Sequence, residues 1–152
     1  MNLAVIGSGG REHSICYKLK QSAKINKLIC IPGNAGTKGL AENINIDIKN
    51  FQEILKIIKI KNIDIVIIGP EEPLVNGITD FLEKKLVKVF GPNKFAAQLE
   101  GSKAFMKNLC KKNNIPTANF GIFQNKNKAK RFLKNSNFPT VIKADNLASG
   151  KG

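Results

Sequence analysis

The sequence predicts an α/β protein built on a doubly wound parallel sheet, and two observations carry this prediction. Short apolar segments rich in β-branched residues alternate with segments whose apolar residues recur at helical spacing, and Gly or Pro follows most of the short segments. The segment 63–68, IDIVII, is almost continuously apolar and branched, as expected of a strand buried on both faces. With 152 residues, the chain has room for one such domain and the opening of a second.

The first predicted unit is strand, helix, strand. A run of β-forming residues over 2–6 stops at a cluster of glycines, and an amphipathic helix follows over 11–22. A second strand over 27–31 ends at Pro32-Gly33. The other predicted elements of this domain are a weak strand (42–46), a helix (50–60), the buried strand (63–68), a helix (75–85) and a short strand (87–90).

The pattern changes after residue 93, so we place the domain boundary between residues 92 and 93. The second module is predicted to contain a short helix, a helix over 102–113 with Ser102 as N-cap, a strand over 118–123, a helix over 126–135 and a strand over 140–144. The sequence stops inside a glycine-rich run, and we therefore expect it to be truncated.

Composition narrows the classes of function. The net charge is +14, but Lys supplies 23 of the 25 cationic residues, whereas nucleic-acid recognition favours Arg and interleaved aromatic residues. We therefore expect no nucleic acid as main partner. No apolar run is long enough for a membrane helix or a signal peptide, which predicts a cytoplasmic protein without membrane contact. Three cysteines without a CxxC pair and a single His predict reduced thiols and no His/Cys metal site.

The first glycine-rich loop, GSGG over 7–10, lies between a predicted strand and a helix, where backbone N–H groups and the helix dipole favour an anion. The dinucleotide fingerprint GxGxxG is not met because position 12 is Glu, and the second strand lacks the acidic residue that would hold a ribose. NAD is therefore disfavoured, and a tight turn without a ligand is the alternative interpretation. Arg11 could clamp a phosphate and His13 could donate a hydrogen bond, with a packing role as the alternative for His13.

Two more loops, PGNAGT over 32–37 and GPEEPL over 69–74, also follow strands and should meet the first loop at the carboxyl edge of the sheet. There Glu71 could hold an amine or a ribose hydroxyl. In the second module, the ammonium groups of Lys103 and Lys143 suit phosphate. The terminal GKG is not a Walker A motif, because Gly152 stands where Ser or Thr is required.

The ordered motifs GSGGREH, PGNAGT, GPEEPL, FGP, LEGSKAFMK and VIKADNLASGKG resemble those of the phosphoribosylamine-glycine ligase (glycinamide ribonucleotide synthetase) family, in the ATP-grasp superfamily. The resemblance runs from Met1 to Gly152. It implies a Rossmann-like N-terminal substrate domain over 1–92, followed over 93–152 by linker helices and the start of an ATP-grasp domain. Two positions depart from the family pattern, since Asn146 replaces a usual Gly and Ser149 a usual Ala.

The resemblance also implies a reaction. Glycine and 5-phosphoribosylamine would be joined at the expense of ATP, giving glycinamide ribonucleotide, ADP and phosphate in purine biosynthesis. The Mg²⁺ ligands are expected beyond residue 152, so no metal ligand and no catalytic residue is assigned here, and the 152-residue chain alone is expected to be inactive. The oligomeric state stays open. The residues that we assign to the sugar-phosphate crevice are Gly9, Gly10, Arg11, His13, Asn34 and Glu71, and those assigned to ATP are Lys103, Lys143, Ser149, Gly150, Lys151 and Gly152.

Two alternatives remain at this point. One is another ATP-grasp ligase of the biotin carboxylase type, which would share the N-terminal fold. The other is a non-catalytic module that binds a phosphoribosyl group or a nucleic acid through its basic surface.

Overall fold

The computed structural model describes residues 1–147. The chain divides into two compact units, Met1–Ala97 and Gln98–Gly152, and each is described by itself. Among the described residues, no helix combines the length and the apolar character that crossing a membrane would require.

The first unit contains a five-stranded sheet in the order β3-β2-β1-β4-β5, and every neighbouring pair is parallel. In the register, Ile6 of β1 pairs with Ile31 of β2 on one side and with Ile68 of β4 on the other. The predicted doubly wound parallel α/β fold is therefore confirmed. The strands are β1 (Asn2–Gly7), β2 (Lys27–Pro32), β3 (Glu42–Asn43), β4 (Ile65–Ile68) and β5 (Lys88–Phe90).

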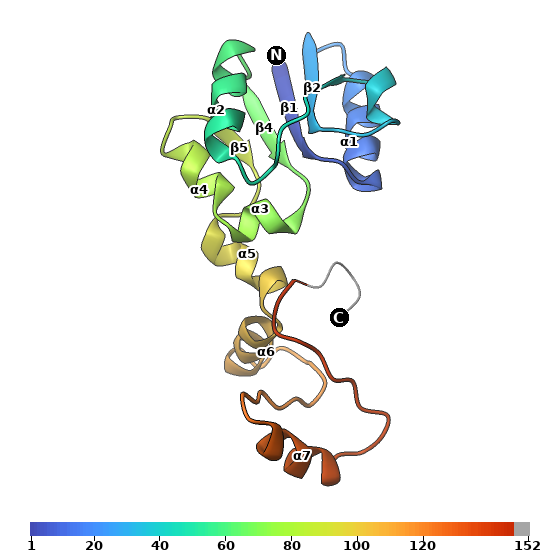
Figure 1. Cartoon of the computed structure of the whole chain (residues 1–152), viewed down its shortest axis with the longest axis vertical. Coiled ribbons are helices and arrows are strands. Elements are labelled where there is room, and N and C mark those ends of the chain that lie inside the picture. Colours follow the sequence, from blue (N-terminus) through green and yellow to red (C-terminus); the bar gives the residue numbers. More distant parts are fainter. Residues whose placement is uncertain (148–152) are drawn as a thin grey trace. The chain divides into compact units, whose positions relative to one another are not determined.

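Helices cover both faces of this sheet (Figure 1). On one face, α1 (Gly10–Lys20) and the 3-10 turn η1 (Thr37–Gly39) flank a small core that includes Val5, Cys16 and Cys30. The opposite face carries α2 (Phe51–Ile60), α3 (Glu71–Val75) and α4 (Ile78–Glu83). Alternate strand residues point to opposite faces, so the odd and even positions of β1 enter different cores.

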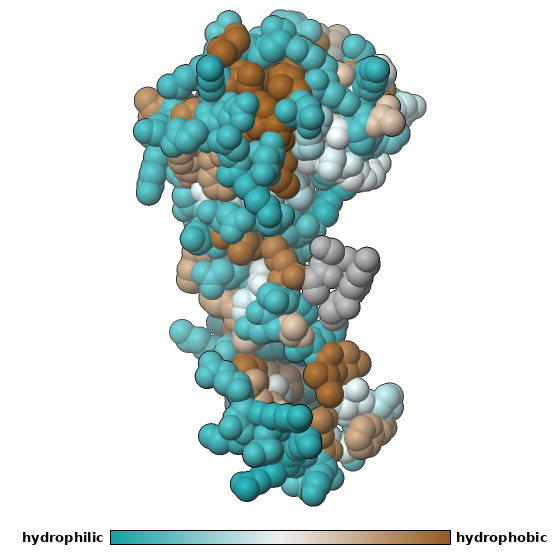
Figure 2. Space-filling view, viewed as in Figure 1, coloured by the Kyte–Doolittle hydropathy of each residue, from teal (hydrophilic) through white to brown (hydrophobic). Residues whose placement is uncertain are grey.

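The larger core lies under α2, α3 and α4 and gives the unit most of its buried apolar surface. Figure 2 shows hydrophilic side chains over much of the visible surface, with apolar groups gathered between them. Each Å² of apolar surface that these side chains remove from water stabilises the folded unit by about 25 cal/mol, which is the main contribution to its stability. This core contains Ala4, Ile6, Ile29, Ile31, Ile46, Ile54, Leu55, Ile58, Val66, Ile68, Leu74, Ile78, Leu82 and Ala97.

The single helix predicted over 75–85 is wrong, because the structure has two shorter helices there. The first, α3, begins at Glu71, inside the segment interpreted as a loop, and Pro73 is tolerated because it lies in the first turn. The chain then breaks at Gly77, whose φ of 90° lies in the left-handed region that glycine adopts without strain. The weak strand predicted over 42–46 is reduced to the two residues of β3.

The second unit contains the end of α5 (Lys94–Gly101), with α6 (Lys103–Lys112) and α7 (Lys126–Lys134). The predicted N-cap of α6 is confirmed, since the Ser102 hydroxyl accepts the Phe105 N–H at 3.0 Å. The strands predicted over 118–123 and 140–144 are wrong: within the described part of this unit neither segment pairs with another strand. A strand needs a hydrogen-bonded neighbour, and Ile142 of the second segment is 78% exposed.

Candidate functional site

The candidate site lies where the strand order reverses, between β1 and β4. After β1 the chain crosses to the face of α1, whereas after β4 it crosses to the face of α3 and α4. The carboxyl ends of the two strands are adjacent, because Ile6 pairs with Ile68. In open parallel sheets, ligands bind in the crevice at such a switch point.

The loop after β1 is held by a hydrogen bond to the buried carboxylate of Glu12. Gly9 is the N-cap of α1, and its N–H donates to Glu12 Oε2 at 2.6 Å. This contact is one half of a capping box, in which a Glu in the first turn returns to the N-cap amide. Glu12 is only 3% exposed. The glycine loop is therefore fixed by a charged hydrogen bond inside the protein.

The Glu12 carboxylate leaves no room for a side chain at Gly69, the first residue after β4. Its N–H donates to the carbonyl of Ile6 at 3.0 Å, which extends the ladder between the strands. A Cβ built on Gly69 would overlap Glu12 Oε1. Glycine is therefore needed here for close approach, and the loops after β1 and β4 meet around Glu12.

Arg11 and Glu71, which the sequence assigned separately to the substrate, bind each other. Arg11 Nη2 donates to Glu71 Oε1 at 2.7 Å, and Arg11 Nη1 donates to the Gly69 carbonyl at the same distance. The Arg11 and Glu71 side chains keep 56% and 30% of their surface exposed. An ion pair with this exposure contributes little to stability.

Asn34 connects the loop after β2 to the loop after β1. Its Nδ2 donates to the Ser8 carbonyl at 2.8 Å and to the Gly9 carbonyl at 3.3 Å, while its Oδ1 accepts the Thr37 N–H at 3.0 Å. The Asn43 side chain in turn donates to the Asn34 carbonyl. These hydrogen bonds bring the loops after β1 and β2 together as predicted, and Asn34 uses both polar atoms of its side chain inside the protein.

His13 lies next to the same loop. A Cβ on Gly36 would come within 3.2 Å of the His13 ring and of Asn34 Oδ1, so the imidazole faces the segment after β2. The ring is exposed. His13, Asn34 and the glycines 9 and 10 are therefore grouped at one edge of the first unit.

The second unit brings together the two segments that the sequence assigned to ATP. The Asp145 carboxylate accepts the Ser102 hydroxyl at 3.0 and 3.2 Å and the Ala104 N–H at 2.9 Å. Lys103 Nζ donates to the Asn146 carbonyl at 2.7 Å. The Ala104 N–H, together with the Ser102 hydroxyl and the Lys103 backbone and charge, holds the pKa of Asp145 below its ordinary value.

Lys143 lies two residues before Asp145, on the same exposed segment. The predicted residues Ser149, Gly150, Lys151 and Gly152 lie outside the described part of the chain. The sequence gives no role to Asp145, because no local pattern indicates that its carboxylate binds Ser102, 43 residues away. It also assigned no role to Glu12, although a Glu three positions after an N-cap glycine is a capping signal.

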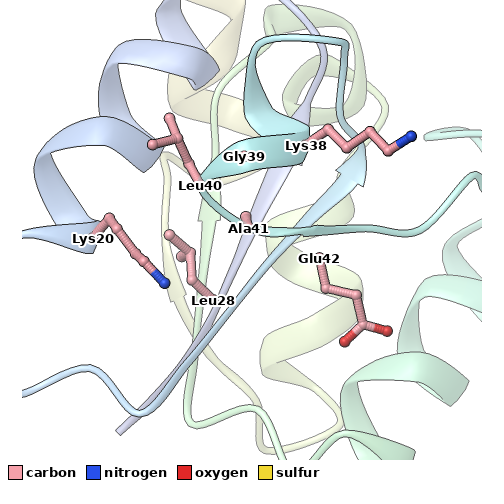
Figure 3. Close-up of a pocket in the computed structure, with 7 residues that line it drawn as sticks. All are labelled: Lys20, Leu28, Lys38, Gly39, Leu40, Ala41 and Glu42. Atoms are coloured by element: carbon pink, nitrogen blue, oxygen red, sulfur yellow. The ribbon is translucent and has the colours of Figure 1, made fainter.

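A hollow of about 230 Å³ lies elsewhere on the first unit and is not part of this site. Figure 3 shows its lining residues, which come from the end of α1, β2 and the segment around η1. None of the residues assigned to substrate lines it. Its lining consists of Lys20, Leu28, Lys38, Gly39, Leu40, Ala41 and Glu42.

Comparison with known proteins agrees with this architecture. Residues 1–100 match the family Phosphoribosylglycinamide synthetase, N domain, and residues 101–152 match Phosphoribosylglycinamide synthetase, ATP-grasp (A) domain. A phosphoribosylamine–glycine ligase of Caldanaerobacter subterraneus subsp. tengcongensis is 48% identical over 152 residues, and one of Clostridium acetobutylicum is 43% identical. In each case the alignment covers 100% of this chain and 36% of the relative. The chain therefore spans little more than a third of these relatives.

Solved structures support the same assignment. The phosphoribosylamine–glycine ligase of Thermotoga maritima superposes with a TM-score of 0.76 at 34% identity, over 100% of this chain and 35% of that one. The biotin carboxylase domain of Hydrogenobacter thermophilus 2-oxoglutarate carboxylase gives a TM-score of 0.68 at 20% identity, over 91% of this chain and 33% of that one, and shares the fold alone. The resemblance inferred from the motifs is confirmed, and the chain belongs to the phosphoribosylglycinamide synthetase family.

Proposed function

We propose that this chain is the N-terminal part of a cytoplasmic ATP-dependent ligase that joins glycine to 5-phosphoribosylamine in purine biosynthesis. ATP transfers its γ-phosphoryl group to the glycine carboxylate, which gives an acyl phosphate and ADP. The amine of phosphoribosylamine then attacks the acyl carbon, a C–N bond forms, the C–O bond to phosphate breaks, and the amine loses a proton. The products are glycinamide ribonucleotide, ADP and phosphate.

The observation that carries the proposal is the grouping of loops at the β1–β4 switch point. Residues 1–92 would hold phosphoribosylamine there, with the backbone at Gly9 and Gly10 and the His13 ring near its polar groups. The Arg11–Glu71 pair has the charges that this ligand requires. A phosphate can replace Glu71 on Arg11, while an amine or a ribose hydroxyl can replace Arg11 on Glu71.

In the second unit, Lys103 and Lys143 would contact the nucleotide phosphates, with residues 148–152 as the adjoining glycine-rich loop. Ammonium groups stabilise charge that develops on a transferred phosphoryl group. Within residues 1–147, no group of three His, Cys, Asp or Glu side chains is placed to hold a metal ion. Our expectation that the Mg²⁺ ligands lie beyond residue 152 stays a prediction.

The test is calorimetric binding of ribose 5-phosphate, a stable analogue of phosphoribosylamine, to the purified chain. We expect saturable binding that Arg11→Ala weakens. The chain has one other arginine, Arg131 in α7, so Arg131→Ala is the matched control and should bind as the unmodified chain does. Absence of binding, or equal losses in both variants, would refute the substrate assignment.

Salt dependence separates this proposal from a nucleic-acid binder. Affinity for duplex DNA should fall with a log–log slope of about −0.9 per phosphate neutralised, whereas a pocket for one sugar phosphate is much less sensitive. Turnover needs a second assay. Glycine-dependent ADP release is expected from a full-length relative and not from the 152-residue chain alone, which covers 36% of such relatives.

A further inference from the structure

The buried carboxylate of Glu12 has no role in the proposed reaction, yet it occupies the centre of the switch point. Its Oε2 accepts the Gly9 N–H at 2.6 Å. Its Oε1 is buried, and within the described residues 1–147 no hydrogen-bond donor reaches it; Arg11 Nε lies 3.8 Å away. An incompletely bonded buried carboxylate is costly, so its retention calls for an explanation.

The backbone around Glu12 leaves room for this carboxylate and for nothing larger. A Cβ on Gly69 would overlap Oε1, and a Cβ on Gly7 would lie 2.6 Å from the Glu12 side-chain carbons. Gly7 ends β1 and Gly69 follows β4, so two separate loops have no side chain at the point where each meets Glu12. A capping residue alone would need only the contact to Gly9.

The same carboxylate lies beneath Arg11. The guanidinium extends from Glu12 across the Gly69 carbonyl to Glu71. The orientation of Arg11 therefore depends on groups from both loops, and Glu12 is the charge that faces its Nε from inside the protein.

We propose that Glu12 is a positioning residue for the switch-point site: it fixes the glycine loop through Gly9 and orients Arg11 for the sugar phosphate, from space that Gly69 leaves open. This inference rests on the proposed function for the identity of the ligand. The coupling between Glu12, Gly9 and Gly69 does not, and can be measured without a ligand.

The direction in which ribose 5-phosphate affinity changes when Glu12 loses its charge distinguishes a positioning role from simple repulsion. A carboxylate near a phosphate site repels the phosphate, so removal of its charge would by itself strengthen binding. A positioning role predicts the opposite result. Glu12→Gln keeps an oxygen that can accept the Gly9 N–H but removes the charge that strengthens this bond and faces Arg11, so it should weaken ribose 5-phosphate binding by about tenfold.

The experiment compares Glu12→Gln with Glu53→Gln in the whole chain. Glu53 occupies the corresponding position in the first turn of α2, next to the cap residue Asn50, and is exposed. Ribose 5-phosphate affinity is measured by calorimetry, and the Gly9 amide is followed in a proton–nitrogen correlation spectrum. We expect Glu12→Gln to weaken binding and to move the Gly9 amide proton upfield, with neither change in Glu53→Gln.

Gly69→Ala is the second arm of the experiment. It should displace the carboxylate and move the Gly9 amide in the same direction, although the two residues lie far apart in sequence. If Glu12→Gln does not fold, Glu12→Asp carries the affinity test, because the shorter side chain keeps its charge but cannot reach Gly9. Unchanged or tighter binding in a folded Glu12 variant, or an unmoved Gly9 amide in Gly69→Ala, would overturn the proposal. If the unmodified chain binds no ribose 5-phosphate, the proposed function fails, and the Gly9 amide still decides the role of Glu12.

Discussion

Asn34 offers a direct test of how the loops at the switch point are held together. Asn34→Ala removes two short hydrogen bonds, from Nδ2 to the Ser8 carbonyl and from the Thr37 N–H to Oδ1. Ser8 is exposed, so its carbonyl regains water and only the net value of that bond is lost. Thr37 is fully buried, so its N–H loses an acceptor that water does not replace. At about 1 kcal/mol for the first bond and at least as much for the second, the free energy of unfolding should fall by about 2 kcal/mol or more.

Asn34→Asp should destabilise at least as much as Asn34→Ala. The carboxylate still accepts the Thr37 N–H, but an oxygen then replaces the donor that lies 2.8 Å from the Ser8 carbonyl. Two acceptors at that distance repel each other. Charge alone cannot produce such a loss, because an added negative charge on a chain of net charge +14 reduces self-repulsion.

The assay is urea unfolding followed by far-ultraviolet circular dichroism. With a slope of about 2 kcal/mol per molar urea, a loss of 2 kcal/mol lowers the midpoint by about 1 M. Asn45→Asp, at an exposed position after β3, is the control and should leave the midpoint near its original value. An Asn34→Asp variant as stable as the unmodified chain would show that Asn34 does not join these loops.

Further predictions concern other regions. Leu86 has φ 61° and is 95% exposed, so Leu86→Gly should raise the free energy of unfolding by about 1 kcal/mol in the same assay. Iodoacetamide should label Cys110 first, because Cys16 and Cys30 are buried and the Cys30 thiol, together with burial, raises the pKa of Cys16; early labelling of Cys16 would contradict this. The folded-state pKa of Asp145 is lowered, so its stabilising contribution is complete above its unfolded pKa and is lost as the pH falls through the folded value. Melting curves of Asp145→Asn and the unmodified chain should therefore begin to converge as the pH falls below about 4, and meet once it is below the folded-state pKa.

The first unit was largely predictable because its signals are local and strong. The branched run before Gly69 could only form a buried strand, and the helices 11–22 and 50–60 were indicated by apolar spacing. The segments 118–123 and 140–144 have the same apolar character but no strand neighbour in the described part of the second unit. Apolar character predicts which segments can form strands, whereas pairing decides which of them do.

The candidate site was predictable in its location and less so in its contacts. Topology places the loops after β1, β2 and β4 at one edge, so their convergence follows from the order of strands and helices. That Arg11 and Glu71 would bind each other could not be inferred, because the contact depends on the turn at Gly69 and on how α3 begins there. The contact between Asp145 and Ser102 could not be inferred either, since a contact across 43 residues leaves no periodic signal in the sequence.

Glu12 shows why a motif can point to a site and still misassign its residues. The glycine loop predicts an anion site, and from the sequence Glu12 is only a departure from the dinucleotide fingerprint. In the structure this Glu binds the Gly9 amide, so it is a carboxylate that satisfies an N–H otherwise available to a ligand. The remaining attraction for a phosphate at this edge then depends more on Arg11, whose side chain Glu12 and Gly69 help to orient. Loss of Arg11 should accordingly weaken ribose 5-phosphate binding more than substitution of Gly10, whose position has open space for a Cβ.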